Sequence, residues 1–546
     1  MTRRLVPWTV LLAWAAIAPR TAAARPLSDW FDLDAEYRVE TTYLNPLELN
    51  GTTARDLTYT EQRLRLDPVL KLGDVARIVT RFDLLDGVLF GDNGDFGGTP
   101  ASNFGMGLTS RWPNSAGWTL GLLEGRDPLD PDSYGPVLRP LDPVKVVNAW
   151  GEVLLPFGVL RVGRQPATTG PGINIHDGSR TNRWGVSRFA ASADRFLFAT
   201  KISEAFAMLL DKGHVADRSM DDGVFVGVAY DQVVEDDISV GRDDLHQVLG
   251  LVQWKARQPG WFGLPWKDFL AQVVVGGRFG KEFDTNVLAI PAVLAFGVGP
   301  VRFRGEFVSV FGHTREISEG LAALRESDAT KRVIRDQTIR MFGAQAQLDV
   351  TTGPVTSTLE FDYASGDSDP RDDTPMTTFS FDRDANVGLL LFKHILAFET
   401  ARSAGVGIEN LRNMGTRSFP LTELASDGRV QNALCVFPQV LYKPWESLGI
   451  RTGALFAWSA APVVDPIMTL LSEDGAEISD DAVNWNGGKP ARFYGTELDL
   501  QVEWTYREHF VWTVEGATLI PGAALEDESG DAVPSFLVQN RFTFVF

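Results

Sequence analysis

The stretch that decides the fold is the C-terminal one, Pro534-Ser-Phe-Leu-Val-Gln-Asn-Arg-Phe-Thr-Phe-Val-Phe546. In an extended chain its apolar side chains share one face and its polar side chains the other, because side chains alternate along a strand. The apolar face holds Phe536, Val538, Phe542, Phe544 and Phe546, and the polar face holds Gln539, Arg541 and Thr543. Two structures produce this pattern: the last strand of a membrane barrel, or an edge strand of a soluble sandwich.

The same alternation recurs along the chain in segments of about ten residues. The clearest examples are 31–40, 64–70, 76–83, 301–307 and 494–506. With the weaker examples we expect about eighteen strands (range about 16–20), an even number being usual for bacterial barrels. The connections between segments alternate between short ones and long ones rich in Asp, Gly, Pro and Ser, which is typical of an outer-membrane barrel. The fold class predicted is therefore all-β, a transmembrane antiparallel β-barrel whose C-terminal strand ends in Phe546.

The N-terminus has the features of a secretory signal peptide. Arg3 and Arg4 precede an apolar run from Leu5 to Ala18, and small residues follow at 21–24. We expect a signal peptide at 1–24 and a single barrel domain at 25–546. No later segment has the ~20 continuous apolar residues of a spanning helix, so a closed barrel is the remaining way to cross a membrane. The predicted location is the outer membrane of a Gram-negative bacterium.

Charge and cysteine content restrict the partners and cofactors. The chain has 51 basic and 71 acidic residues, a formal net charge of −20, which argues against nucleic acid as a partner. Cys435 is the only cysteine, so neither an intramolecular disulfide nor a cysteine-based metal site can form. We expect no cofactor. The expected partners are outer-membrane lipids, lipopolysaccharide and, through the C-terminal strand, the barrel-assembly machinery; the sequence does not determine the oligomeric state.

Three stretches resemble motifs of the alginate-export family of outer-membrane β-barrels. The most specific is Thr358–Phe379, which contains Tyr-Ala-Ser-Gly-Asp followed by Asp-Pro. The second is Pro156–Gln165 leading to Gly172–Gly178, and the third runs from Gly495–Leu500 to Ile520–Gly522. The resemblance implies an eighteen-stranded channel that passes an anionic polysaccharide. Channels of that family line the pore with excess arginine, whereas the inward positions here carry both signs of charge.

The candidate pore-lining residues are charged side chains at the inward positions of the predicted strands. They are Arg63, Arg65, Arg77, Arg81, Arg161, Arg302, Arg304, Glu306, Glu360 and Asp362. A ring of arginines would select anions. Alternatively, each arginine pairs with a carboxylate on a neighbouring strand and braces the barrel. Bracing is the favoured interpretation for any single residue, while we expect some basic constriction in the pore as a whole.

Two loops carry further candidates. A glycine-rich loop containing Gly170, Gly172, Asn174, Asp177 and Gly178 is either a constriction that folds into the lumen or an ordinary flexible extracellular loop. An acidic loop contains Asp367, Asp369, Asp372 and Asp373, whose oxygen-rich spacing suits Ca²⁺. That loop lacks the glycine and the bidentate glutamate of an EF-hand, so a solvated loop is favoured over a metal site.

Enzyme signatures are poor. The chain has no Gly-x-Ser-x-Gly elbow and no His-Glu-x-x-His pair, so we do not expect an enzyme. The predicted function is an outer-membrane, porin-like channel for the passive passage of solutes or the export of a polysaccharide. The alternatives are a plugged barrel that acts as a scaffold or adhesin, and a barrel phospholipase that would use Ser368.

Overall fold

The computed structural model describes most of the chain. The described residues are 26–47, 49, 56–91, 118–119, 137–138, 142–178, 182–188, 190–211, 214–215, 217, 219–233, 245–281, 283–316, 318–319, 322, 328, 330–369, 371–400, 426, 428–464, 482–485 and 488–546. The expected signal peptide lies outside them.

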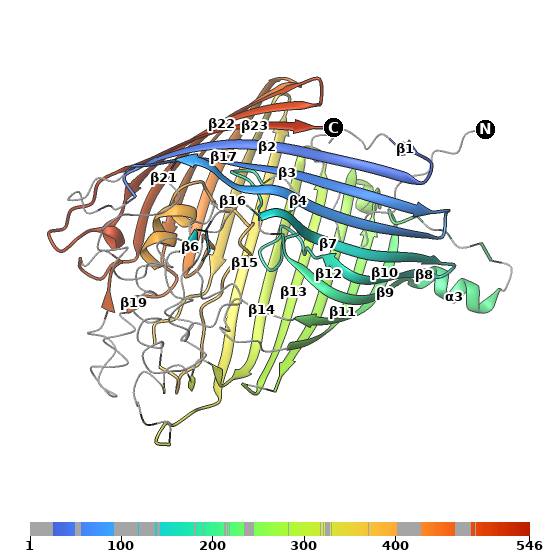
Figure 1. Cartoon of the computed structure of the whole chain (residues 1–546), viewed down its shortest axis with the longest axis horizontal. Helices are drawn as coiled ribbons and strands as arrows, with labels where there is room; N and C mark the ends of the chain where they lie inside the picture. The colour runs from blue at the N-terminus through green and yellow to red at the C-terminus, as the bar shows by residue number, and fades with distance from the viewer. Residues whose placement is uncertain are drawn as a thin grey trace.

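Eighteen antiparallel strands form one closed barrel within the described residues (Figure 1). They are β2 (Phe31–Asn45), β3 (Leu57–Leu72), β4 (Ala76–Gly91), β7 (Asp142–Leu155), β8 (Gly158–Pro166), β9 (Ser192–Lys201), β10 (Gly223–Val233), β11 (Leu245–Ala256), β12 (Trp266–Gly280), β13 (Thr285–Val298), β14 (Val301–Thr314), β15 (Gln337–Thr352), β16 (Val355–Ala364), β17 (Ala433–Trp445), β18 (Leu448–Trp458), β21 (Phe493–Tyr506), β22 (Phe510–Pro521) and β23 (Ser535–Val545). Each strand pairs with the next in this order. The predicted all-β barrel of about eighteen strands is confirmed.

The remaining elements are short. Strand β1 (Pro26–Ser28) pairs with the start of β2, and two small hairpins are formed by β5 (Trp118–Thr119) with β6 (Val137–Leu138) and by β19 (Val463–Val464) with β20 (Ala482–Val483). The helical segments are α3 (Ile202–Leu210), the π-helix η3 (Leu391–Leu396), and the 3₁₀ turns η2 (Trp261–Gly263) and η7 (Ala523–Leu525). Among the residues that the structure describes, no helix is long and apolar enough to cross a bilayer.

The C-terminal strand closes the barrel against β2. Phe544 lies opposite Tyr37, and Arg541 lies opposite Glu40. The backbone N–H of Phe546 donates to the carbonyl of Ala35 at 3.0 Å, and the N–H of Ala35 donates back at 2.8 Å. The last residue of the chain therefore takes part in the closure, because these bonds satisfy backbone groups that would otherwise form a sheet edge.

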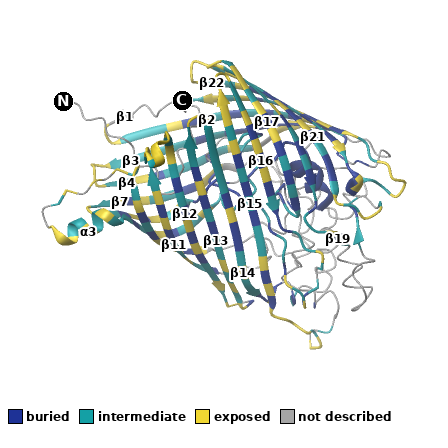
Figure 2. Ribbon diagram, turned by 180° about the vertical axis from the view of Figure 1, so that it is seen from behind, coloured by how far each residue is buried: buried dark blue, intermediate teal, exposed yellow. Residues whose placement is uncertain are grey.

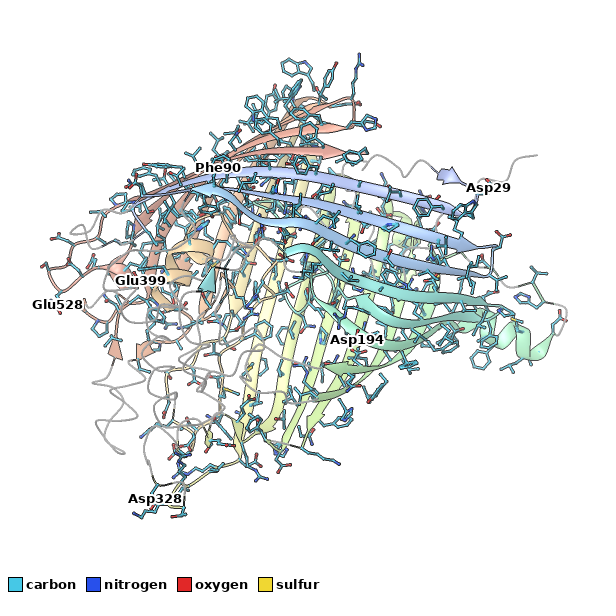
Figure 3. All side chains as sticks on the ribbon, in the orientation of Figure 1. Asp29, Phe90, Asp194, Asp328, Glu399 and Glu528 are labelled. Atoms are coloured by element: carbon cyan, nitrogen blue, oxygen red, sulfur yellow. The ribbon has the colours of Figure 1, made fainter. Side chains whose placement is uncertain are left out.

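The two faces of the wall differ in polarity, as the sequence alternation predicts. On β23 the phenylalanines at 536, 542 and 544 are exposed on the outside, whereas Gln539 and Arg541 are buried on the lumen side. Figure 2 shows the resulting bands of exposed and buried residues along the strands. Aromatic rings gather at one end of the outer face, where Trp254, Trp261 and Phe269 lie with ring centroids 4.9–5.3 Å apart. Rings also project outward around the ends of β22 and β23 (Figure 3).

Most short connections lie at one end of the barrel and most long ones at the other, the long 202–222 connection with α3 being an exception. The turns at 73–75, 299–300, 353–354, 446–447 and 507–509 are short and lie at the end where β2 begins and β23 finishes. The long connections include 167–191, 365–432 and 459–492. In Figure 3, Asp328 and Glu528, which belong to the connections at the long-loop end, lie far from Asp29. The described parts of two long connections, within 167–191 and 365–400, fold back into the barrel, and these build the candidate site.

Candidate functional site in the lumen

Two long connections meet inside the barrel. Lumen loop A is residues 167–191, between β8 and β9, and lumen loop B is residues 365–400, after β16. The Asp384 carboxylate accepts hydrogen bonds from the backbone N–H groups of Arg188 at 2.5 Å and Ala190 at 2.9 Å. The side-chain amide of Asn386 donates to the carbonyl of Trp184 at 2.9 Å. The two loops are therefore docked on each other as well as on the wall.

Loop A is attached to β14 by the carboxylate of Glu306. This carboxylate accepts hydrogen bonds from the Thr169 hydroxyl at 2.5 Å and from the backbone N–H groups of Gly172 at 2.8 Å and Ile173 at 3.1 Å. The glycine at 170 has φ +42, and a Cβ there would lie 2.7 Å from the Val293 side chain. The loop backbone therefore approaches the wall more closely than a residue with a side chain would allow.

The other side of loop A is attached to β3. Arg65 donates to the carbonyl of Gly178 at 2.8 Å, and Arg188 of the loop forms an ion pair with Glu61 at 2.8 Å. In the order of strands around the barrel, β3 and β14 are nine strands apart in both directions. Loop A therefore spans the lumen between opposite walls.

The middle of loop A carries an aromatic anchor. Trp184 is 1% exposed, its indole N–H donates to Gln439 at 3.1 Å, and its ring stacks on Phe437 with centroids 5.9 Å apart. The neighbouring Arg183 forms an ion pair with Asp349 at 3.0 Å. These contacts attach the loop to β15 and β17, so that three parts of the wall hold one connection.

Loop B inserts the apolar run 387–398, which forms η3 and the turns beside it. The carboxylate of Glu497 on β21 accepts hydrogen bonds from the backbone N–H groups of Leu389, Leu390 and Leu391 at 2.6, 2.8 and 2.7 Å. Negative charge at this position is favourable because the N–H groups of the first turn have no partner within the helix. The apolar side chains of the run pack with Phe437 and Leu455 in one buried cluster.

Each of the seven predicted pore-lining arginines forms an ion pair with a carboxylate. The pairs are Arg63–Glu36 at 3.2 Å, Arg65–Asp83 at 2.7 Å, Arg77–Glu152 at 2.6 Å, Arg81–Asp67 at 2.6 Å, Arg161–Glu152 at 2.5 Å, Arg302–Asp268 at 3.3 Å and Arg304–Asp349 at 3.5 Å. This geometry fits bracing across neighbouring strands for the short, buried pairs. The two longest pairs both involve β14, and their arginines are partly exposed.

The three predicted acidic residues take different places. Glu306 holds loop A. Glu360 accepts hydrogen bonds from Gln347 at 3.2 Å and Gln439 at 3.0 Å, and Asp362 accepts one from Gln345 at 2.6 Å. All three carboxylates are buried, so they contribute to the wall and its contacts with the loops.

The five residues predicted to form a constriction all lie in loop A. Gly172 and Gly178 have positive φ angles of +102 and +64, and a Cβ at either position would collide with His176 or Ala190. The Asp177 N–H donates to the Thr168 hydroxyl at 3.0 Å, and Asn174 is half-buried. The structure places these residues inside the barrel; that they limit permeation stays a prediction.

Three of the four acidic loop residues are paired with arginines, and the fourth, Asp367, accepts hydrogen bonds from the backbone N–H groups of Asp369 at 2.9 Å and Thr377 at 3.0 Å. Arg371 binds Asp369 at 2.8 Å, and Arg335 binds Asp372 at 3.1 Å and Asp373 at 3.4 Å. No group of three or more His, Cys, Asp or Glu side chains among the described residues is arranged to hold a metal ion. Farther along loop B, burial, with a further contribution from Asp384, raises the pKa of Asp382 to about 7.

Sequence reasoning missed the loop side chains that make the site. Arg183, Trp184 and Arg188 stand in a loop otherwise rich in glycine, serine and asparagine, and this contrast is the one signal that could have identified them. Their partners lie more than a hundred residues away in the chain. Spacing along the sequence therefore could not reveal the contacts.

Several solved structures are similar to this one over most of its length. They include OccAB1 from Acinetobacter baumannii (TM-score 0.45, 9% identity, 96% of this chain and 99% of that chain), OccK5 from Pseudomonas aeruginosa (0.42, 8%, 94% and 98%) and a BenF-like porin from Pseudomonas fluorescens Pf-5 (0.41, 10%, 94% and 99%). No family model and no curated protein matches the chain. The resemblance to the alginate-export family therefore stays a prediction.

Proposed function

We propose that this chain is a porin-like channel of a Gram-negative outer membrane, through which small solutes diffuse past loop A. One observation carries the proposal: a loop tied to opposite walls crosses the lumen of a closed barrel with an apolar outer face. An apolar exterior and a closed hydrogen-bonded wall are what a bilayer requires of a spanning β-structure. A loop across the lumen narrows the aqueous path while leaving the wall intact.

The charge of the lumen supports a preference for anions. Arg302 and Arg304 of β14, Arg183 of loop A and Arg451 of β18 carry positive charge near the short-turn end. Asp349 pairs with both Arg183 and Arg304, so one carboxylate is shared between two of these cations. Because Arg183 and Arg304 share one carboxylate, we propose that this part of a water-filled lumen with low-dielectric walls attracts anions.

Export of an anionic polysaccharide would use the same charge. A polymer, however, has to pass a loop that is attached to β3 and β14 at once, and this requires loop A to undock. We propose that a small solute passes beside the docked loop. We therefore propose small anionic solutes as the preferred substrates of the channel.

A plugged barrel, acting as a scaffold or adhesin, is the second candidate function. The observation in its favour is the buried apolar cluster that loop B forms with the wall at Phe437 and Leu455. Such packing fills part of the lumen. The two functions differ in one measurable property, the passage of ions.

The test is single-channel conductance of the refolded full chain in planar bilayers, with the reversal potential measured in a salt gradient. We expect discrete steps and anion preference, and we expect Arg302→Ala with Arg304→Ala to lower the anion-to-cation permeability ratio at least about twofold. The matched control is Arg164→Ala with Arg340→Ala, which removes equal charge from exposed residues on the outer face.

The outcomes separate the candidates. A correctly folded barrel that shows no conductance steps at any salt concentration is a plugged barrel. If conductance is present but the lumen variant keeps the wild-type reversal potential, the arginines at 302 and 304 brace the wall and do not select ions.

A further inference from the structure

Helix α3, between β9 and β10, turns its apolar side away from the protein. Phe206, Leu209 and Leu210 are 61%, 78% and 88% exposed, and no residue of the helix is fully buried. The helix lies at the short-turn end of the barrel, beyond the ends of β8 and β9 (Figure 1). A helix on a water-facing surface normally buries its apolar side, so α3 has the opposite arrangement.

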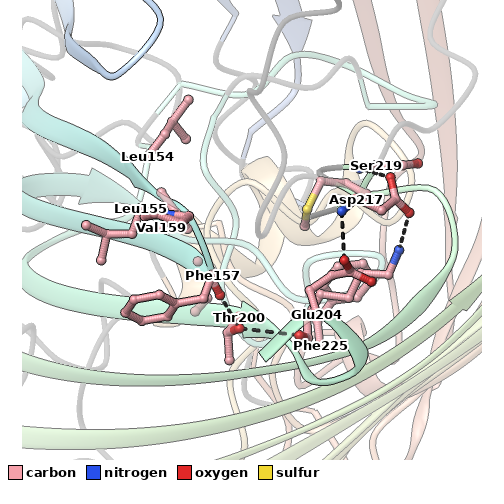
Figure 4. Close-up of a pocket in the computed structure, with 14 residues that line it drawn as sticks. Leu154, Leu155, Phe157, Val159, Thr200, Glu204, Asp217, Ser219 and Phe225 are labelled. Carbon is pink, nitrogen blue, oxygen red and sulfur yellow. Dashed lines mark hydrogen bonds and ion pairs between the residues drawn. The ribbon is translucent and has the colours of Figure 1, made fainter. Parts of the chain in front are cut away.

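The polar side of α3 faces the returning chain. The Glu204 carboxylate hydrogen-bonds the His214 ring at 2.8 Å and accepts the backbone N–H of Asp217 at 2.7 Å. Glu204 and Asp217 also line a cavity of about 50 Å³ whose other walls include Val159 and Phe225 (Figure 4). The side of α3 that faces the rest of the protein is therefore the side that carries Glu204.

The returning chain lies on the lumen side of the wall. Met220 packs against Val159, Leu197 and Ala199, which are buried inward positions of β8 and β9. Successive residues of an α-helix are rotated by about 100°, so Phe206 lies about 200° from Glu204. The apolar side of α3 consequently faces away from the lumen.

The outer surface next to α3 is also apolar. Phe157, on the turn between β7 and β8, is exposed, and its ring centroid lies 6.0 Å from that of Phe198 on the outer face of β9. The adjacent turn between β11 and β12 exposes Phe262 at 92% and is tied to the α3 connection by the ion pair Arg257–Asp221 at 3.1 Å. The exposed side of α3 thus continues the outer apolar band at the short-turn end.

We propose that α3 is an in-plane membrane anchor whose apolar side inserts into the periplasmic leaflet of the membrane that the barrel spans. The occupant of this surface is phospholipid, because the surface is continuous with the lipid-facing band and α3 presents Phe206, Leu209 and Leu210 there without a charged group. Interfacial helices of this kind bury their apolar side about 5–10 Å into the headgroup and acyl boundary. The proposal rests on insertion of the barrel in a membrane.

The test is depth-dependent fluorescence quenching on the full-length barrel in phosphatidylethanolamine–phosphatidylglycerol vesicles. An environment-sensitive fluorophore is attached at Leu210→Cys in a Cys435→Ala background, with Leu209→Cys as a second site. The lipid reference is Val228→Cys, on the exposed outer face of β10, and the water reference is Glu528→Cys on a long-loop turn. Folding is checked by the heat-dependent mobility of the barrel in detergent gels.

We expect quenchers placed near the headgroup to quench the label at position 210 at least about twofold more strongly than quenchers near the chain end. If the labels at 209 and 210 are quenched no more than the label at 528, while the label at 228 is quenched, the anchor proposal is wrong. The placement of the barrel in the membrane is then still supported. Protection of 210 from lipid with concentration-dependent self-quenching also overturns it, since a second copy then covers the helix. Absence of quenching at 228 overturns the membrane placement itself.

Discussion

The carboxylate of Glu306 is the attachment whose removal should most directly release loop A. It accepts three hydrogen bonds from the loop, from the Thr169 hydroxyl and the Gly172 and Ile173 N–H groups. Hydrogen bonds to a charged acceptor contribute about 1.5–3 kcal/mol each, so the three together contribute at most about 9 kcal/mol when the carboxyl group is ionised. A change of about 5.5 kcal/mol moves a two-state equilibrium from 99:1 to 1:99. Glu306→Ala should therefore undock this segment in a large fraction of the molecules.

The assay combines single-channel conductance with limited proteolysis of loop A. Glu306→Ala should increase the unit conductance and the rate of cleavage within the loop, because the segment no longer lies across the lumen. Glu306→Gln should have a smaller effect, since the amide keeps one acceptor oxygen but loses the charge and places an NH₂ group beside backbone donors. The matched control is Gln345→Ala, directly opposite on β15, whose side-chain amide donates to Glu360 and Asp362 of the wall.

The reasoning is refuted by a folded Glu306→Ala barrel with wild-type conductance and wild-type resistance to proteolysis. In that case the contacts to β3 and β17 would hold loop A without Glu306. An equal increase in conductance and in loop cleavage in Gln345→Ala would also refute the reasoning, because the effect would then come from the wall rather than from the loop.

Two further predictions concern loop B. The folded pKa of about 7 for Asp382, whose charged neighbours are Asp384 and Arg429, lies above the ordinary value of 3.8. The docked loop therefore binds a proton that the undocked loop has already released, so docking is strongest in acid and weakens as the pH rises through 7. Between about pH 5.5 and 8.5 the free energy of docking of loop B should fall by about 2 kcal/mol. Hydrogen exchange in the loop measures this change, which should be absent in Asp382→Asn. Glu497→Ala should abolish the exchange protection of the N–H groups at 389–391, whereas Glu503→Gln, farther along β21, should leave it intact. Equal protection in both variants would contradict the capping role.

Local sequence pattern predicted the wall well. Alternating polarity predicted about eighteen strands, and the clearest predicted segments fall on β2, β3, β4, β14, β21 and β23. It also gave the orientation of β23, with Phe542 outward and Arg541 inward. The alternation is reliable because each strand separates an apolar exterior from a polar lumen, and that separation acts on every residue of the strand in turn.

The same pattern could not decide what an inward charge does. Arg81 and Arg304 look alike in sequence, yet Arg81 binds Asp67 on the neighbouring strand at 2.6 Å, whereas Arg304 shares Asp349 with an arginine of loop A. Register between strands and the path of a distant loop fix these partners. Neither quantity is encoded within a few residues of the arginine.

The sequence by itself determined that this protein is a barrel, which face of each strand is apolar, and that Phe546 belongs to the closing strand. These are properties of period-two alternation, and the chain carries them locally. Only the tertiary structure decided that loops A and B enter the lumen, because their attachment depends on carboxylates such as Glu306 and Glu497 that lie more than a hundred residues from the backbone they bind. Contacts between distant segments form only when closure of the barrel brings opposite walls within reach of one loop.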